Sequence, residues 1–317
     1  MTGAPATHCD ALDHRVLFYV ADHDYLDGVT SFVRDGLGAG EPALVAVPGQ
    51  RLELVRAALN GSADRVEFVD MTALGRNPSR IIPTVRAFTD SRPGQRTRFV
   101  GEPIWAGRSE AEIREATRHE ALLNLAFADT ATTILCPYDA TGLDDNVLAD
   151  AHRTHPHVVR LSGLAPSGDY DGHALAAATP LPPRPDDAEE TTFDRDSLGE
   201  LRRFTASRGA GFGVSPERAQ DMMLAVHELA ANTVRHSGRP AGTVAVWRAP
   251  DTGAIVCEVA DEGRIDDPLA GRREPSSCAL DGRGLWLVNQ ICDLVELHSG
   301  HAGTTIRLHT LPSPHGG

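Results

Sequence analysis

The spacing of apolar residues divides the chain into two differently organised parts. From residue 14 to residue 162, short apolar runs alternate with segments whose apolar residues recur at helical spacing. The runs predict strands at 14–20, 43–48, 65–71, 97–103 and 132–140. The segments between and after them predict helices at 24–40, 50–60, 78–90, 109–129 and 144–155. Five strand–helix units in series predict an α/β fold, a mostly parallel sheet with helices on both faces. Ser109 and Glu112 form the pattern of a capping box at one helix start.

A different composition begins after residue 162. Proline, glycine, alanine and acidic residues dominate 163–192 without periodicity, so we predict a linker, which we bound at 166–192. Beyond it, helices are predicted at 196–210, from Ser215 to residue 237, and at 283–299, and strands at 242–249, 254–261 and 304–312. Interspersed strands and helices predict a two-layer α/β sandwich over 193–311.

Polar residues recur along one face of the helix that begins at Ser215. Glu228, Asn232 and His236 are four residues apart and therefore share a face. A carboxylate one turn before an amide suits a base beside a Mg²⁺ ligand, because Mg²⁺ prefers oxygen donors. The same spacing is also common on an ordinary solvated helix face.

Three further motifs follow in order. Asp261 ends a strand and Gly263 lies two residues beyond it, where a flat ring could approach the backbone. The run Gly282, Arg283, Gly284, Leu285 opens a helix whose bare amides suit an anion. Thr304 follows a glycine before the last strand. Each motif taken alone is equally compatible with a simple turn.

The four motifs together resemble the GHKL ATPase superfamily and, within it, the bacterial anti-sigma-factor serine kinases. The resemblance covers 193–311. It implies that Glu228 is the catalytic carboxylate, that Asn232 binds Mg²⁺, and that ATP binds the remaining motif residues. These are Asp261 for the adenine amine, Gly263 for its ring, Gly282, Arg283, Gly284 and Leu285 around the phosphates, and Thr304 through water. In the family, a second glycine follows the position of Gly263 at the hinge of the ATP lid. This sequence lacks that glycine, so the hinge of the corresponding lid, at 264–281, departs from the family pattern.

The composition agrees with this resemblance. All 30 basic residues are arginine, which excludes a Walker A lysine and the strand lysine of eukaryotic-type kinases; the GHKL site needs neither. The net charge of −14 argues against a general nucleic-acid or membrane surface. The five cysteines include no CxxC pair, so we expect reduced thiols, no zinc site and a cytoplasmic location. No signal peptide or transmembrane run is predicted.

The first 165 residues resemble MEDS-type sensory domains over 10–165. These domains look like RecA-type ATPase folds without a phosphate loop and are thought to bind small molecules. Candidate ligand residues at the strand ends are His14, Tyr19, His23, Cys136, Tyr138 and Asp139, and core packing is an alternative explanation for Cys136 and Tyr19. The series His152, His155 and His157 suggests metal, but we interpret it as incidental.

The sequence therefore predicts a cytoplasmic transcription regulator. Its small-molecule sensor would control an ATP- and Mg²⁺-dependent serine/threonine kinase of the anti-sigma type. The partners would be a STAS-type anti-anti-sigma protein and a sigma factor; whether the chain forms a homodimer stays open. Two alternatives remain: an ATP-binding partner-switch module without phosphotransfer, and a sensor histidine kinase-like protein. A decayed ATPase is disfavoured because Glu228 and Asn232 are present.

Overall fold

The computed structural model describes residues 11–160, 162–176, 180–275 and 282–312. The chain divides into two compact units, one with a sheet built from residues 13–166 and one with a sheet built from residues 189–310. Among the described residues, no helix is long and apolar enough to cross a membrane.

The N-terminal sheet is mostly parallel, as predicted. Its strands run in the order β3-β2-β4-β5-β1-β6-β7, and only β7 is antiparallel to its neighbour. The strands are β1 (Asp13–Tyr19), β2 (Ala43–Val47), β3 (Val66–Asp70), β4 (Thr97–Gly101), β5 (Thr132–Asp139), β6 (His157–Arg160) and β7 (Gly163–Pro166).

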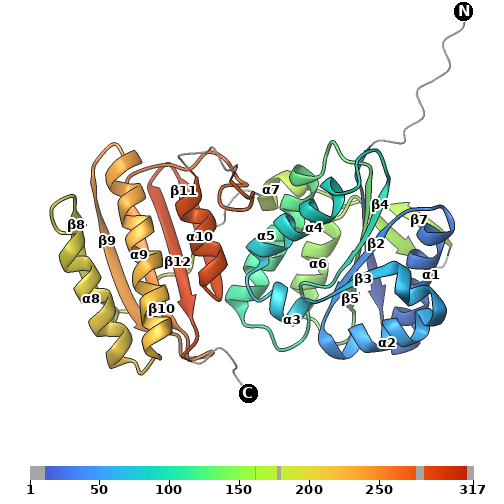
Figure 1. The fold of residues 1–317 in the computed structure, drawn as a ribbon, viewed down its shortest axis with the longest axis horizontal. Helices are drawn as coiled ribbons and strands as arrows, with labels where there is room; N and C mark the ends of the chain where they lie inside the picture. The colour runs from blue at the N-terminus through green and yellow to red at the C-terminus, as the bar shows by residue number, and fades with distance from the viewer. Residues whose placement is uncertain (1–10, 161, 177–179, 276–281, 313–317) are drawn as a thin grey trace, which may run out of the picture. The chain divides into compact units, whose positions relative to one another are not determined.

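Helices cover both faces of this sheet (Figure 1). The chain steps across the sheet in one direction from β1 to β3 and in the other from β3 to β5. Because such crossovers are right-handed, the helices of the two stretches lie on opposite faces. The helices are α1 (Asp22–Gly38), α2 (Gly49–Leu59), α3 (Met71–Leu74), α4 (Ile81–Asp90), α5 (Glu110–Ala126), α6 (Asp145–Thr154) and α7 (Gly172–Ala176), with 3₁₀ turns at Asn60–Arg65 and Pro78–Arg80.

The predicted capping box at the start of α5 is confirmed. The amide and hydroxyl of Ser109 both donate to Glu112 Oε2 at 2.9 Å, and the Glu112 amide donates to Ser109 Oγ at 3.4 Å. These bonds satisfy amides that the helix itself cannot pair.

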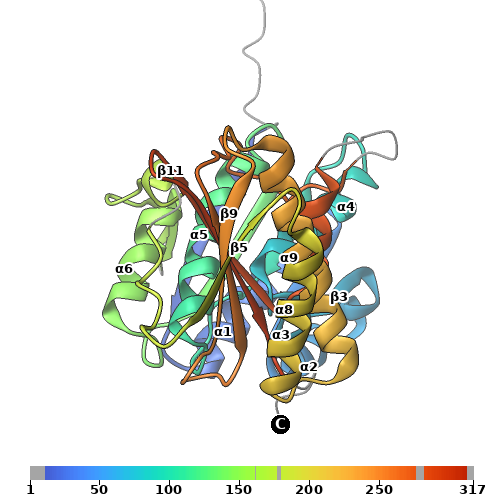
Figure 2. The ribbon, with the colours of Figure 1, turned by 90° about the vertical axis from the view of Figure 1, so that its left-hand side faces the viewer.

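The C-terminal unit is the predicted two-layer sandwich. Its antiparallel strands run in the order β11-β12-β10-β9-β8, and α8 and α9 lie on the same side of them in Figure 2. The strands are β8 (Glu189–Asp194), β9 (Ala241–Arg248), β10 (Ile255–Asp261), β11 (Leu294–Gly300) and β12 (Gly303–Thr310), and the helices are α8 (Leu198–Gly211), α9 (Pro216–His236) and α10 (Arg283–Ile291).

Two sequence predictions of secondary structure are wrong. Part of the predicted linker is regular, since α7 lies within it and β8, which begins in it, extends the C-terminal sheet; just before it, β7 pairs with β6. These edge strands gain backbone pairing with little apolar burial, so periodicity does not reveal them. The predicted helix at 283–299 ends at Ile291, and residues 294–300 form β11. Cys292 already has extended backbone angles. The short apolar run from Leu294 to Leu297 is compatible with a helix or with a strand, so the pattern alone could not distinguish them.

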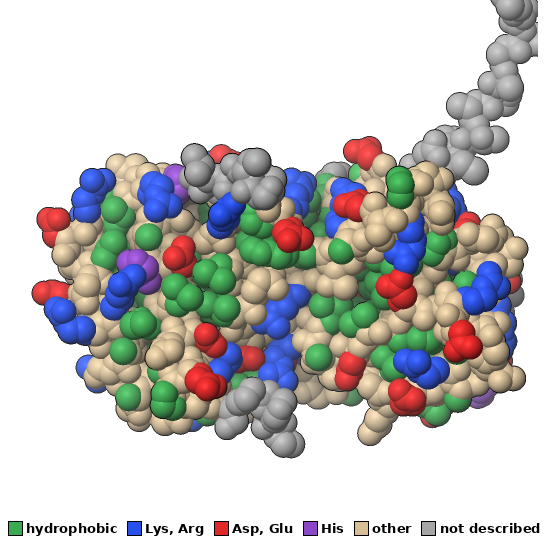
Figure 3. Space-filling view, in the orientation of Figure 1, with side chains coloured by type: hydrophobic (Ala, Val, Ile, Leu, Met, Phe, Trp, Pro, Cys, Tyr) green, Lys and Arg blue, Asp and Glu red, His purple; other side chains and the backbone are tan. Residues whose placement is uncertain are grey.

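Charges of both signs are mixed on the molecular surface. Arginine and acidic side chains are interspersed over the face drawn in Figure 3. Several form exposed ion pairs, such as Arg239 with Glu262 at 2.9 Å. Pairs of this kind contribute little to stability.

Candidate functional site

Helix α9 places the predicted catalytic face beside the sheet. The helix begins where Ser215 Oγ accepts a hydrogen bond from the amide of Arg218, with proline at its first position. One stripe of the helix is buried, since its four members are at most 3% exposed: Met222, Val226, Leu229 and Thr233. Packing of this stripe leaves Glu228 and Asn232 half-buried on the neighbouring face.

A pocket of about 350 Å³ opens beside α9. Its lining brings together most of the residues that the sequence analysis assigns to ATP: Asn232, Asp261, Gly263, Gly282, Gly284, Leu285 and Thr304. His236, the third member of the α9 face, also lines it. Glu228 and Arg283 are not among the lining residues, and Arg283 is exposed at the start of α10. Residues from four separate motifs thus share one cavity.

The carboxylate of Asp261 is held in place at the end of β10. Its Oδ1 accepts the amide of Gly263 at 2.6 Å, and its Oδ2 accepts the hydroxyl of Thr233 from α9. Thr304 lies directly across the sheet from Asp261 and donates to the carbonyl of Gly263 at 2.9 Å. A carboxylate oriented by two donors keeps further lone pairs for a ligand amine.

Gly303 is required by the backbone around Asp261. Its φ of +123° is one that side chains rarely adopt, and a Cβ there would lie 2.1 Å from the carbonyl oxygen of Asp261. The glycine therefore lets the start of β12 approach the end of β10, which fixes Thr304 beside the pocket.

Helix α10 begins directly against the α9 side chains. Gly282 caps it with φ +86°. A Cβ on Gly284 would lie 3.0 Å from Asn232 Nδ2 and 3.1 Å from Glu228 Oε2. The bare first turn of α10 thus lies against the predicted carboxylate and amide, although Glu228 itself does not line the cavity.

Comparison with known proteins places these features in a family. The model of the histidine kinase-like ATPase domain matches residues 191–310. This part of the chain is a histidine kinase-like ATPase domain. The family described as the methanogen/methylotroph, DcmR sensory (MEDS) domain matches residues 13–156. The chain therefore combines a MEDS domain with a histidine kinase-like ATPase domain, as the resemblances implied.

The comparisons with curated proteins and with solved structures add less than the family models. No curated protein matches the chain. One similar solved structure is that of the RsbU and RsbW domains of Rv1364c from Mycobacterium tuberculosis, with 20% identity and a TM-score of 0.31. The match covers 40% of this chain and 33% of that one, so the chain spans about a third of that protein's length.

In the ATPase domain, the segment after Gly263 differs partly from expectation. Arg264 and Arg273 are exposed, and Arg264 Nε lies 2.6 Å from Asp266 Oδ1. Arg272 in the same segment is instead 2% exposed. Residues 276–281 of the predicted lid lie outside the described residues.

The MEDS domain gathers polar groups at the carboxyl end of its sheet. Glu102 follows β4 and accepts the hydroxyls of Tyr19 at 3.3 Å and Tyr25 at 3.1 Å. The guanidinium of Arg51 lies over both rings, 4.7 and 4.4 Å from their centroids, and its buried Nη1 has no hydrogen-bond partner among the described residues. Burial raises the pKa of Glu102 to about 7. Open α/β sheets bind ligands at this edge; the sequence analysis included Tyr19 but missed Glu102 and Arg51.

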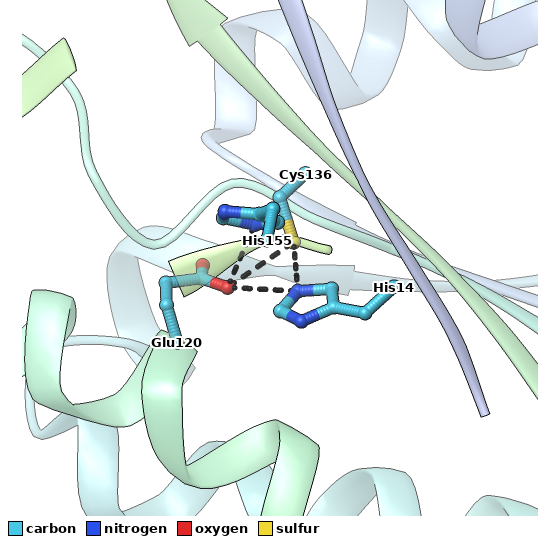
Figure 4. Close-up of side chains that lie close together, drawn as sticks. All are labelled: His14, Glu120, Cys136 and His155. Atoms are coloured by element: carbon cyan, nitrogen blue, oxygen red, sulfur yellow. Dashed lines mark hydrogen bonds and ion pairs between the residues drawn. The ribbon is translucent and has the colours of Figure 1, made fainter. Parts of the chain in front are cut away.

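A second polar cluster of the MEDS domain was not predicted as a unit. His14, Glu120, Cys136 and His155 are all buried, and their ligating atoms lie within 4.8 Å of one another (Figure 4). His14 and Cys136 were separate candidates, while His155 was interpreted as incidental. The set is assembled from distant segments, and no spacing in the sequence signals it.

Proposed function

We propose that the chain is a cytoplasmic regulator of the anti-sigma type, in which the ATPase domain is a serine/threonine kinase controlled by the MEDS domain. The observation that carries this proposal is the convergence of four separate motifs on one pocket, with the Glu228 carboxylate close to Gly284. A pocket alone would suit many ligands. A pocket that combines an oriented carboxylate, a glycine-bearing helix start and a carboxylate–amide pair suits a nucleoside triphosphate.

The site fits ATP at both ends. At the adenine end, Asp261 would accept the exocyclic amine, Thr304 would act through water, and the flat backbone at Gly263 would lie against the ring. At the phosphate end, the amides of Gly282, Arg283 and Gly284 and the positive end of α10 would face the anion. Leu285 is 8% exposed and would close the apolar floor.

The phosphate end also fits Mg²⁺. Asn232 and Glu228 offer hard oxygen donors one helical turn apart, and both flank the position of Gly284. Asn232 would hold the ion, which supplies neutralisation of the phosphate charge when bound.

Glu228 would act as the base for transfer. It would accept the proton of a partner serine hydroxyl while that oxygen bonds to the γ-phosphorus and the bond to the leaving ADP oxygen breaks. The partner would be a STAS-type anti-anti-sigma protein, and a sigma factor would be the second partner.

The MEDS domain would supply the control. The buried, unpaired Nη1 of Arg51 and the Tyr19–Glu102 hydrogen bond at the sheet edge suit a small polar molecule with an acceptor atom. An unpaired buried donor costs about 1–3 kcal/mol, which a ligand acceptor would offset.

One experiment separates the kinase from its alternatives. The full chain is incubated with γ-labelled ATP, Mg²⁺ and candidate STAS-type proteins. We expect acid-stable label on the partner, as for phosphoserine. Acid-labile label on the chain itself would favour the histidine kinase-like alternative. ATP binding without transfer to any partner would favour the partner-switch module.

A further inference from the structure

The buried cluster of the MEDS domain has the composition of a metal site. His14 comes from β1, Cys136 from β5, Glu120 from α5, and His155 from the residue that ends α6 (Figure 4). All four residues are at most 1% exposed. Two imidazoles, one sulfur and one carboxylate are a ligand set typical of Zn²⁺.

The distances between the ligating atoms fit a tetrahedral ion. Zn²⁺ bonds of about 2.0–2.3 Å at tetrahedral angles place ligand atoms about 3.3–3.8 Å apart. Here His14 Nε2 lies 3.2 Å from Glu120 Oε2 and 3.4 Å from Cys136 Sγ. Cys136 Sγ and His155 Nε2 each lie 3.3 Å from Glu120 Oε2. No pair in the set exceeds 4.8 Å, so small side-chain rotations suffice to enclose an ion.

Hydrogen bonds outside the cluster orient both imidazoles. His155 Nδ1 lies 2.8 Å from the carbonyl oxygen of Ala151, which can only accept, so Nδ1 carries the proton. Asn124 donates its amide to the carbonyl of Thr154 at 2.8 Å, which turns its oxygen toward His14 Nδ1 at 3.1 Å. Both histidines therefore present an unprotonated Nε2 to the cluster. Partners of this kind fix the tautomer of metal-binding histidines.

The interior of the cluster then holds more acceptors than donors. Two Nε2 lone pairs and the Glu120 carboxylate converge, and the Cys136 thiol is the only donor among the four groups. Within the part of the chain that the structure describes, His155 Nε2 and Glu120 Oε1 have no hydrogen-bond partner. Leaving such buried atoms unsatisfied costs about 1–3 kcal/mol each. A cation at the centre would satisfy all of them.

We propose that His14, Glu120, Cys136 and His155 bind one Zn²⁺ ion that ties β1, β5, α5 and the end of α6 together. On binding, the Cys136 thiol loses its proton to solvent and its sulfur bonds to the ion as thiolate. Four protein ligands complete a tetrahedral shell, so the site is a closed one. This assignment concerns the MEDS domain alone and does not depend on the kinase activity of the ATPase domain.

The competing arrangement is a proton in place of the ion. One imidazole would then be protonated at Nε2 and paired with Glu120, and the site would have no special affinity for metal. The two arrangements differ in metal content and in the state of the Cys136 sulfur, and both can be measured without any activity assay.

The test uses the full chain purified without a histidine tag. Elemental analysis by mass spectrometry should find about one zinc per chain. After removal by a chelator, titration with Co²⁺ should produce the intense visible bands of a tetrahedral site and a near-ultraviolet thiolate-to-cobalt charge-transfer band. A protein that holds no zinc and gives neither absorption with Co²⁺ would overturn the proposal and favour the protonated pair.

Variants locate the site and separate it from surface histidines. Cys136→Ser should abolish the charge-transfer band, while Cys292→Ser, which removes a buried thiol of the other unit, should leave it unchanged. His157→Gln, two residues beyond His155, should also leave it unchanged. A band that survives in Cys136→Ser would contradict the assignment.

A last variant keeps all four ligands in place and so guards against loss of folding. Asn124→Ala removes only the group that orients His14. Loss of such a partner weakens metal binding by about 10–100-fold. We therefore expect Co²⁺ to bind Asn124→Ala with the same spectrum but that much weaker affinity. Unchanged affinity would show that His14 is not a ligand held in this way.

Discussion

The two units differ in where their polar side chains gather. In the ATPase domain, polar side chains line an open pocket and come from motifs that are each a few residues long, such as Asp261 with Gly263. In the MEDS domain, polar side chains are sealed inside the fold, and the four members of the metal cluster come from segments more than ten residues apart. A substitution in the open pocket should therefore change ligand binding, whereas a substitution in the buried groups should change the stability of the unit that contains them. The predictions below test that distinction.

The largest effect is expected at Glu228. Glu228→Gln keeps the size of the side chain but removes its basicity, so phosphoryl transfer should fall about 10²–10⁴-fold. ATP affinity and thermal stability should change little, because the side chain lies behind the cavity lining and is half-buried. Labelled-phosphate transfer and calorimetric ATP binding measure the two quantities.

Glu217→Gln is the matched control for this variant. Glu217 lies on the same helix and is exposed, so transfer should stay near the wild-type rate. Equal losses in both variants would mean that the helix, not the carboxylate, is responsible. A wild-type rate in Glu228→Gln would remove Glu228 from the role of base.

A smaller effect is expected at Asp261. Asp261→Asn replaces an acceptor for the adenine amine with a group that can present a donor. Hydrogen bonds to charged groups contribute about 1.5–3 kcal/mol, so ATP should bind about 10–100-fold more weakly. Titration of the full chain with Mg²⁺ and ATP measures the change.

Asp251→Asn provides the comparison for Asp261. Asp251 is exposed in the turn before β10 and lies outside the pocket, so its variant should bind ATP as the wild type does. If Asp261→Asn also bound ATP normally, the adenine would have to lie elsewhere, and Asp261 would not be the acceptor of the adenine amine.

The same contrast explains what the sequence could predict. That these residues gather around one pocket could be predicted because each motif is local: Glu228 and Asn232 share a helix face, and Gly282 and Gly284 share a helix start. The fold class could also be predicted, because five buried strands alternate with amphipathic helices. The sequence did not reveal β8 or β11, since edge strands with short apolar runs satisfy more than one pattern.

The sealed groups could not be found in this way. Glu120 lies in the middle of α5, where a glutamate is an ordinary helix residue. Only tertiary packing brings it to His14, more than a hundred residues earlier in the chain. Glu102 could not be predicted for a related reason, because its partners Tyr25 and Arg51 come from α1 and α2. Both sets of contacts depend on the order of the strands in the sheet, which the sequence did not specify.

The smallest expected effect concerns Glu102 and the pH dependence of the MEDS domain. Burial raises the pKa of Glu102 to about 7 in the folded protein, against about 4.3 in an unfolded chain. The folded state therefore binds the proton more tightly, and this contribution to stability is present below about pH 4.3 and lost as pH rises through about 7. The neighbouring charges are Arg51, which opposes the rise, and Asp139, which adds to it. Between pH 5 and pH 8, we expect the wild type to lose about 1–3 kcal/mol from this group.

Glu102→Gln should remove that pH-dependent loss. Hydrogen exchange of amides in β1 and β5, corrected for the intrinsic effect of pH on exchange, reports the stability of this unit separately from the ATPase domain. The variant should show a flatter dependence than the wild type between pH 5 and pH 8. Glu53→Gln, which alters an exposed carboxylate on α2, should retain the wild-type slope. Identical slopes for the wild type and Glu102→Gln would mean that Glu102 stays ionised beside Arg51 throughout. The carboxyl end of this sheet would then resemble the open ATP pocket, with a charge held ready for a ligand, rather than the sealed cluster around Glu120.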